Sequence, residues 1–70
     1  MKIGVVMRKV NSAEFTHTAM KLCHAYGTIN TMGPKNLTLW VCKDGDAEMC
    51  RETLEETGAK FIRYYYMKVE

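Results

Sequence analysis

The chain has 70 residues, of which 47% are hydrophobic and 26% are charged, and its formal net charge is +2. These proportions are typical of a folded globular domain and exclude an intrinsically disordered chain. The charge is too small to indicate nucleic-acid binding by itself, and no apolar run approaches the roughly 20 residues of a membrane span. We expect one domain over residues 1–70, small enough that association with a partner would help to stabilise it.

The cysteines and the start of the chain indicate a cytoplasmic protein. Cys23, Cys42 and Cys50 are odd in number, and the first apolar segment begins two residues after Met1, which leaves no room for a signal peptide. We therefore expect free thiols in a reducing compartment. Because no C-x-x-C pair or Cys/His ligand spacing occurs, the sequence predicts no bound metal and no other cofactor.

The first half of the chain predicts a strand followed by a helix. Ile3–Val10 begins with a short apolar run rich in β-branched residues, which is typical of a central strand. In the next segment, Asn11–Gly27, apolar residues recur at helical spacing and form one stripe. We expect Asn11 and Glu14 to cap the start of this helix and Gly27 to end it.

The second half predicts a hairpin, a second helix and a last strand. Thr28–Lys43 has the turn residues Gly-Pro-Lys-Asn at its middle. Alternation along its second arm places Trp40 on the side of the sheet away from the helices. Asp46–Thr57 is expected to form a helix capped by an aspartate of the preceding turn. Lys60–Val69 is expected to form the last strand.

The expected element order is therefore β-α-β-β-α-β. Two amphipathic helices need one sheet to cover, and both crossovers in this order would be right-handed. The sequence predicts an α+β fold of the ferredoxin-like kind, a two-layer sandwich with a four-stranded antiparallel sheet and two helices on one face. The first and third strands would be central, and the other face of the sheet would be open.

This open face is the first candidate for function. Trp40 should lie on it with Val6, and at least one of three successive tyrosines in the last strand must join them, because strand side chains alternate. An exposed aromatic and aliphatic patch usually marks an interface, so we expect a homodimer. Its expected contacts are Val6, Trp40, Tyr64, Tyr65 and Tyr66. The rings could instead only cover the sheet edges. RNA bases could also stack there, but the strands lack the signature of sheet-based RNA-binding modules, so nucleic acid is disfavoured.

The turn between the first strand and the first helix is the second candidate. The first amides of a helix attract a carboxylate or phosphate, and several nearby side chains add donors. These side chains are Arg8, Lys9, Asn11 and Ser12. Simple capping of the helix would explain the same residues. His17 and His24 are two helical turns apart, too far to share a metal ion, and no catalytic constellation is found.

Two segments resemble the ACT-domain family, the small regulatory modules of amino-acid metabolism. Ala25–Asn30, which reads Ala-Tyr-Gly-Thr-Ile-Asn, is similar to the family's passage from the first helix into the second strand. Asp46–Phe61 is similar to its second helix, which ends at a glycine before the last strand. The resemblance covers nearly the whole chain in element order and length.

The resemblance implies paired domains and a bound amino acid or similar effector beside the turn after the first strand. The matching positions are Arg8, Lys9, Val10, Asn11, Ser12, Ile29 and Asn30. Family members that bind amino acids commonly have an acidic residue followed by Pro-Gly in this turn. This chain has Val-Asn-Ser-Ala at residues 10–13 instead.

We therefore predict a non-enzymatic, cytoplasmic ACT-like regulatory module that binds a small molecule and forms a homodimer. The alternative is a stand-alone protein–protein interaction module, such as a small inhibitor or adaptor that docks through the open sheet face. An acylphosphatase-type enzyme would share the topology, but it usually needs a longer chain and an arginine–asparagine pair in the right places.

Overall fold

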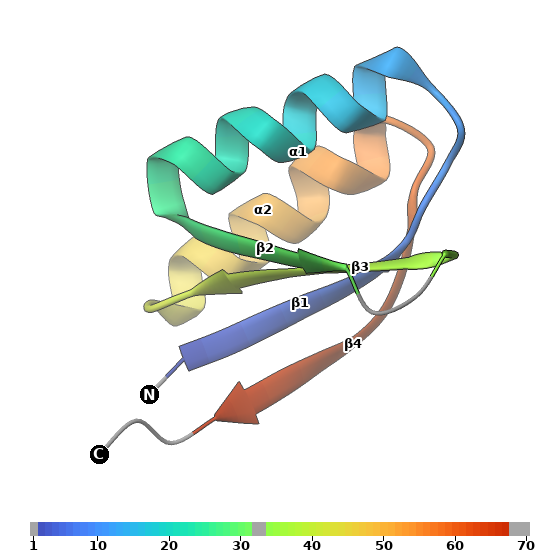
Figure 1. Cartoon of the computed structure of the whole chain (residues 1–70). Helices are drawn as coiled ribbons and strands as arrows, with labels where there is room; N and C mark the ends of the chain where they lie inside the picture. The colour runs from blue at the N-terminus through green and yellow to red at the C-terminus, as the bar shows by residue number, and fades with distance from the viewer. Residues whose placement is uncertain (1, 32–33, 68–70) are drawn as a thin grey trace.

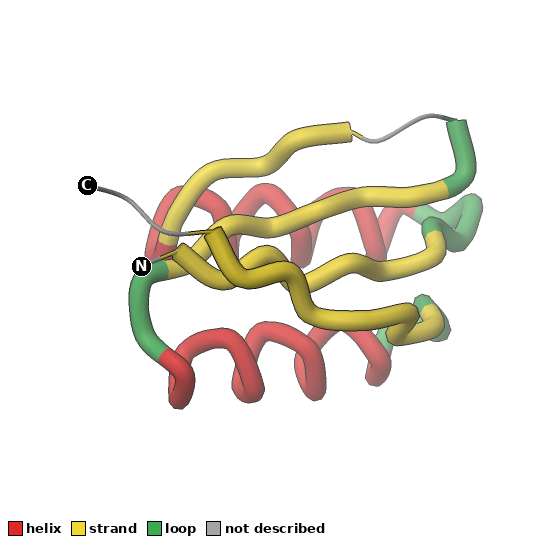
Figure 2. Tube along the Cα trace, turned by 90° about the horizontal axis from the view of Figure 1, so that it is seen from below, coloured by secondary structure: helices red, strands yellow, loops and turns green. Residues whose placement is uncertain are grey.

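The computed structural model describes residues 2–31 and 34–67, without the side chains of residues 28, 30 and 31. The elements are β1 (Lys2–Arg8), α1 (Ala13–Tyr26), β2 (Gly27–Thr31), β3 (Asn36–Val41), α2 (Asp44–Glu56) and β4 (Lys60–Met67). The strands form an antiparallel four-stranded sheet in the order β2-β3-β1-β4. Both helices lie on one side of this sheet (Figure 1), and the view from below in Figure 2 shows the strands in front of them. Among the described residues, no helix has the length and apolar composition needed to cross a bilayer.

Helix α1 begins two residues later than the sequence indicates. Its N-cap is Ser12, whose Oγ accepts a hydrogen bond from the backbone N–H of Phe15 at 3.1 Å, so the expected cap at Asn11 is wrong. Serine and asparagine are nearly equal as N-caps, and the pattern alone could not separate two neighbouring polar residues. At the other end the Gly27 N–H donates to the carbonyl of Cys23, and β2 begins at Gly27 itself.

Helix α2 begins two residues earlier than expected. Its N-cap is Lys43, which makes no side-chain capping hydrogen bond, so an aspartate cap is wrong. Asp44 and Asp46 lie in the first turn instead, where their charge stabilises the positive end of the helix dipole. After the helix, Gly58 adopts a φ of 98°, a left-handed conformation that favours glycine. The expected end of the last strand, Val69, lies outside the described residues.

The core lies between the sheet and the helices. Val5, Leu39 and Leu54 have no exposed surface, and burial of each such side chain contributes about 1.5–3 kcal/mol. The whole cluster is Ile3, Val5, Met7, Phe15, Ala19, Leu22, Leu37, Leu39, Val41, Ala47, Cys50, Leu54 and Ala59. Both helices contribute to it, so the pairing of α1 and α2 over one sheet follows from their apolar stripes.

The opposite face of the sheet is not bare, which corrects the expectation that this face would be open. Val6 is only 3% exposed and Thr38 is fully buried, although no helix covers that face. The indole of Trp40 is half-buried, and a Cβ built on Gly4 would lie 2.9 Å from its Cζ3 atom. The ring therefore lies against the backbone of β1. Side chains of the sheet itself bury the centre of its second face.

The close approach of β2 to β3 at Gly27 predicts a sensitive position. A Cβ on Gly27 would overlap the carbonyl oxygen of Trp40, and a backbone atom cannot rotate aside as a side chain can. We expect Gly27→Ala to destabilise the fold by about 3 kcal/mol in urea unfolding. Gly45→Ala is the matched control because nothing lies within 4 Å of its Cβ position. Equal unfolding midpoints for the two variants would contradict this account.

The buried thiol of Cys50 predicts a loss of stability in alkali. Burial, with a smaller contribution from Asp46, raises the pKa of this thiol from 9.0 to about 11. Through that interval the unfolded chain releases the proton while the folded chain keeps it. The stabilisation is therefore complete below the unfolded pKa of 9.0 and is lost as the pH rises towards 11, by about 3 kcal/mol in all.

Replacement of the thiol separates this effect from the titration of tyrosine and lysine. We expect urea unfolding of the wild type to lose more stability between about pH 8 and about pH 10.5 than unfolding of Cys50→Ala does. The variant starts from a lower stability because it leaves a small cavity, so the comparison is of slopes. Parallel pH dependences would show that this thiol does not titrate as described.

Candidate functional site

A cationic hollow lies where β1 ends and the chain turns towards α1. Its volume is about 460 Å³, and among the described residues Arg8, Lys9 and Lys35 line it without any acidic side chain. The backbone N–H of Lys9 donates to the carbonyl of Lys35 at 2.7 Å and holds the two segments together. The described residues that line it are Arg8, Lys9, Val10, Asn11, Phe15, Thr16, Pro34 and Lys35.

The structure brings four of the predicted ligand residues, Arg8 to Asn11, into this one hollow. Ser12 caps α1 and lines a neighbouring hollow with Asn11. Ile29 lines an adjoining hollow of about 230 Å³ that shares Lys9, Phe15 and Thr16 with the first. The side chain of Asn30 lies outside the described residues.

Sequence reasoning did not assign Lys35 to the site. It treated this residue only as part of the hairpin turn. The signal was available in the antiparallel pairing of β1 with β3, because Arg8 lies opposite Asn36. Because the strands are antiparallel, Lys35, which precedes Asn36, must then lie beside Lys9, which follows Arg8. A fourth cation, Lys60 of β4, pairs with Arg8 and lines a further hollow of about 180 Å³ with it. Like charges placed directly opposite each other are destabilising, which favours an anion here.

The aromatic residues of β4 are divided between the two faces of the sheet. The register shifts between Val6 and Met7, so Ile62 is left without a partner. This bulge places Phe61 and Tyr64 on the same side, with ring centroids 4.8 Å apart. Tyr64 packs against the core, and Tyr64 and Tyr66 line a hollow beside Ala47 of α2.

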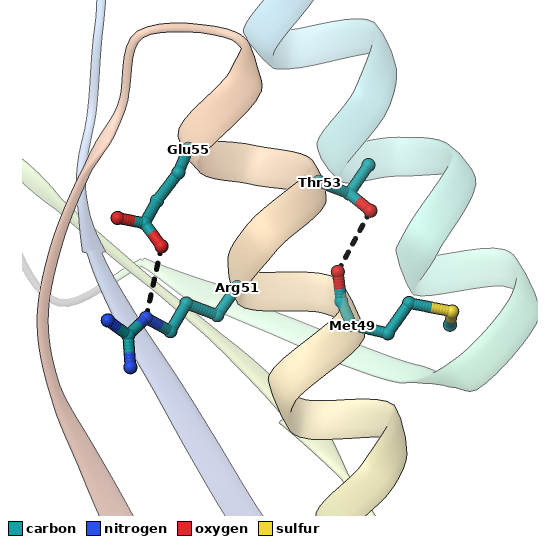
Figure 3. A network of polar contacts seen from close by, with 4 residues as sticks. All are labelled: Met49, Arg51, Thr53 and Glu55. Atoms are coloured by element: carbon teal, nitrogen blue, oxygen red, sulfur yellow. Dashed lines mark hydrogen bonds and ion pairs between the residues drawn. The ribbon is translucent and has the colours of Figure 1, made fainter.

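An arginine of α2 contacts the aromatic residues on the helix side. The Cζ atom of Arg51 lies 4.1 Å from the centroid of the Phe61 ring, and its Nε donates to Oε1 of Glu55 at 3.0 Å (Figure 3). On the neighbouring helix face, the hydroxyl of Thr53 donates to the carbonyl of Met49 at 2.8 Å. Arg51 thus links α2 to β4, and Phe61 is kept on the helix side of the sheet.

The predicted interface therefore does not form one patch. Tyr64 and Tyr66 lie on the helix side, and Val6 is buried within its own chain. Trp40 and Tyr65 remain on the other side, where both pair with Gly4 and their ring centroids lie 6.4 Å apart at an interplanar angle of 29°. The expectation that Val6 would be exposed for contact with a partner is wrong, because side chains of the sheet already cover it.

The remaining candidates from the sequence are dispersed. His17 and His24 are exposed, as is Cys42, whereas Cys50 is buried. Among residues 2–31 and 34–67, no three histidine, cysteine, aspartate or glutamate side chains gather as metal ligands would. The chemistry that the described residues offer is thus cationic at the end of β1 and aromatic on the sheet face.

The packing of Trp40 on Gly4 predicts the effect of one added methyl group. In Gly4→Ala the new Cβ would lie 2.9 Å from Cγ2 of Thr38 and Cζ3 of Trp40, so the indole must move outwards. We expect a loss of about 1–3 kcal/mol in stability. The emission of Trp40, the one tryptophan of the chain, should shift to the red and be quenched more by acrylamide. Emission and quenching like those of the wild type would contradict this packing.

Comparison with known proteins found no family model, no curated protein and no solved structure that matches the chain. Three cations line the hollow at the start of a helix, and the sheet face carries two stacked rings with further cations beside them.

Proposed function

We propose that the chain is a small cytoplasmic regulatory module, not an enzyme, that binds a small carboxylate of the amino-acid type beside α1. The observation that carries this proposal is the hollow lined by Arg8, Lys9 and Lys35 at the start of a helix. Four of the seven positions that the ACT-like resemblance implies, Arg8 to Asn11, line this hollow, which supports the proposal.

The charges around the hollow favour the carboxylate end of such a ligand. Its three cations come from two segments of the chain, and the first turn of α1 adds the positive end of a helix dipole. The volume of about 460 Å³ is within the ordinary range of small-molecule sites. Arginine is suited to a carboxylate because its planar donors can bind both oxygens.

The apolar side of the hollow suits the rest of the ligand. Phe15 is 3% exposed and lines both this hollow and the adjoining one that contains Ile29 and Leu37. A short hydrophobic side chain could therefore extend from the cations towards β2. Because no acidic side chain in the described part of the chain lines either hollow, a 2-oxo acid suits the site better than an amino acid whose ammonium group needs a partner.

Thermal unfolding against a matched panel of 2-oxo acids and amino acids tests this proposal. A ligand present at about 100 times its dissociation constant adds about 2.7 kcal/mol to the free energy of unfolding, which raises the Tm of a domain this small by about 10 °C or more. We expect branched or aromatic 2-oxo acids to give the largest shift and the corresponding amino acids a smaller one.

The cations provide the matched variants. Lys9→Gln combined with Lys35→Gln should abolish the shift, because it removes two of the three lining charges. Lys21→Gln, on the exposed side of α1, changes the same kind of charge away from the hollow and should leave the shift unchanged. The proposal fails if no carboxylate raises the Tm, or if the double variant responds as the wild type does.

A further inference from the structure

The two rings on the sheet face form a platform over the centre of β1. The six-membered ring of Trp40 lies against Gly4, and Tyr65 approaches from the other side of the same residue. Their centroids are 6.4 Å apart and their planes are inclined by only 29°. Both rings are half-buried, so each also presents surface to the outside. Planar groups of this kind stack on nucleic-acid bases whatever the base sequence.

An arginine extends this platform. The Cζ atom of Arg63 lies 3.9 Å from the centroid of the Tyr65 ring, and the side chain is exposed. Within the described part of the chain, no carboxylate forms an ion pair with Arg63. A guanidinium that stacks through its flat face keeps its N–H groups at the edge, where a phosphate can accept two hydrogen bonds.

Charge is separated between the sheet and the helices. The four strands contain no aspartate or glutamate. Their cations are Lys2, Arg8, Lys60 and Arg63. The pairings of Arg8 with Lys60 and of Val6 with Arg63 place these cations on the face that carries Gly4. The acidic residues of the helices are Glu14 in α1 and Asp44, Asp46, Glu48, Glu52, Glu55 and Glu56 in α2.

We propose that this sheet face binds single-stranded nucleic acid, with bases stacked on Trp40 and on the Arg63–Tyr65 pair beside it, and phosphates held by the edge of Arg63 and by Arg8 and Lys60. A partner that carries both flat rings and regular negative charge matches both features of the face. A second copy of the chain, paired symmetrically through this face, does not match these features, because the cations of one copy would lie against those of the other. Strand β1 has no aromatic residue of its own, but Trp40 of β3 occupies the space above Gly4, so a ring still lies over this central strand.

Titration of the pure protein with a decamer of uridylate tests the proposal. Stacking of bases on Trp40 should quench its emission. Affinity should fall with salt, with a slope of log K against log[salt] of about −2, because about three phosphates are neutralised on a single strand. Inorganic polyphosphate of similar length is the control for charge alone. The proposal is overturned if polyphosphate binds as tightly as the decamer, or if the decamer leaves the emission unchanged at low salt.

Two pairs of variants separate stacking from charge, with a labelled decamer as the probe. Tyr65→Leu should weaken binding about 10-fold with an unchanged salt slope, whereas Tyr26→Leu, on the exposed side of α1, should not. Arg63→Gln should reduce the salt slope by about 0.7, and Lys21→Gln should leave it unchanged. Urea unfolding of each variant establishes that it is folded at the temperature used. Equal affinities for Tyr65→Leu and Tyr26→Leu would overturn the assignment of Tyr65.

Light scattering distinguishes a second copy of the chain from nucleic acid on this face. The proposal expects a monomer whose mass increases by that of one decamer. A stable dimer that Tyr65→Leu dissociates and the decamer does not would show that another copy occupies the face, and would overturn the proposal. The two proposals share Arg8, but Tyr65 does not line the hollow, so Tyr65→Leu should leave the Tm shift caused by a carboxylate unchanged.

Discussion

The absence of a side chain at Gly4 determines how the second face of the sheet is built. Gly4 lies on the central strand β1, opposite Trp40 on one neighbour and Tyr65 on the other. With a methyl group there, the indole could not lie against the strand. Without one, a ring from β3 covers part of β1, and the neighbouring positions Val6 and Thr38 are buried without a second layer of helices. A small domain thereby buries apolar surface on both sides of one sheet.

The bulge in β4 has an equally specific consequence for the aromatic residues. A regular strand would place Phe61 on the same side as Tyr65, because both numbers are odd. The bulge at Ile62 reverses that alternation, so Phe61 joins Tyr64 near Arg51 and leaves the other face to Arg63 and Tyr65. One irregular residue thus distributes the rings between the core side and the solvent side.

Local pattern predicted some of these features and could not predict others. The apolar stripe through Phe15 and Leu22 indicated α1 because helical periodicity is a property of the segment itself. The cap at Ser12 was missed by one residue because two adjacent polar residues both suit that position. Residues 8–11 were expected at one site since they are consecutive, whereas Lys35 reaches it through strand pairing. The position of Trp40 against Gly4 is a contact between two strands, which no local pattern contains.

The covered second face changes what an interface would contribute to this chain. A bare apolar sheet would need a partner for stability, since hydrophobic burial is the main favourable contribution to folding. Here Val6 and Thr38 are already removed from water, so a partner gains little from them. What remains accessible is the surface of two rings and the cations beside them, and such groups select a partner by stacking and charge. The surface is therefore suited to recognition of an anionic partner more than to completion of the fold.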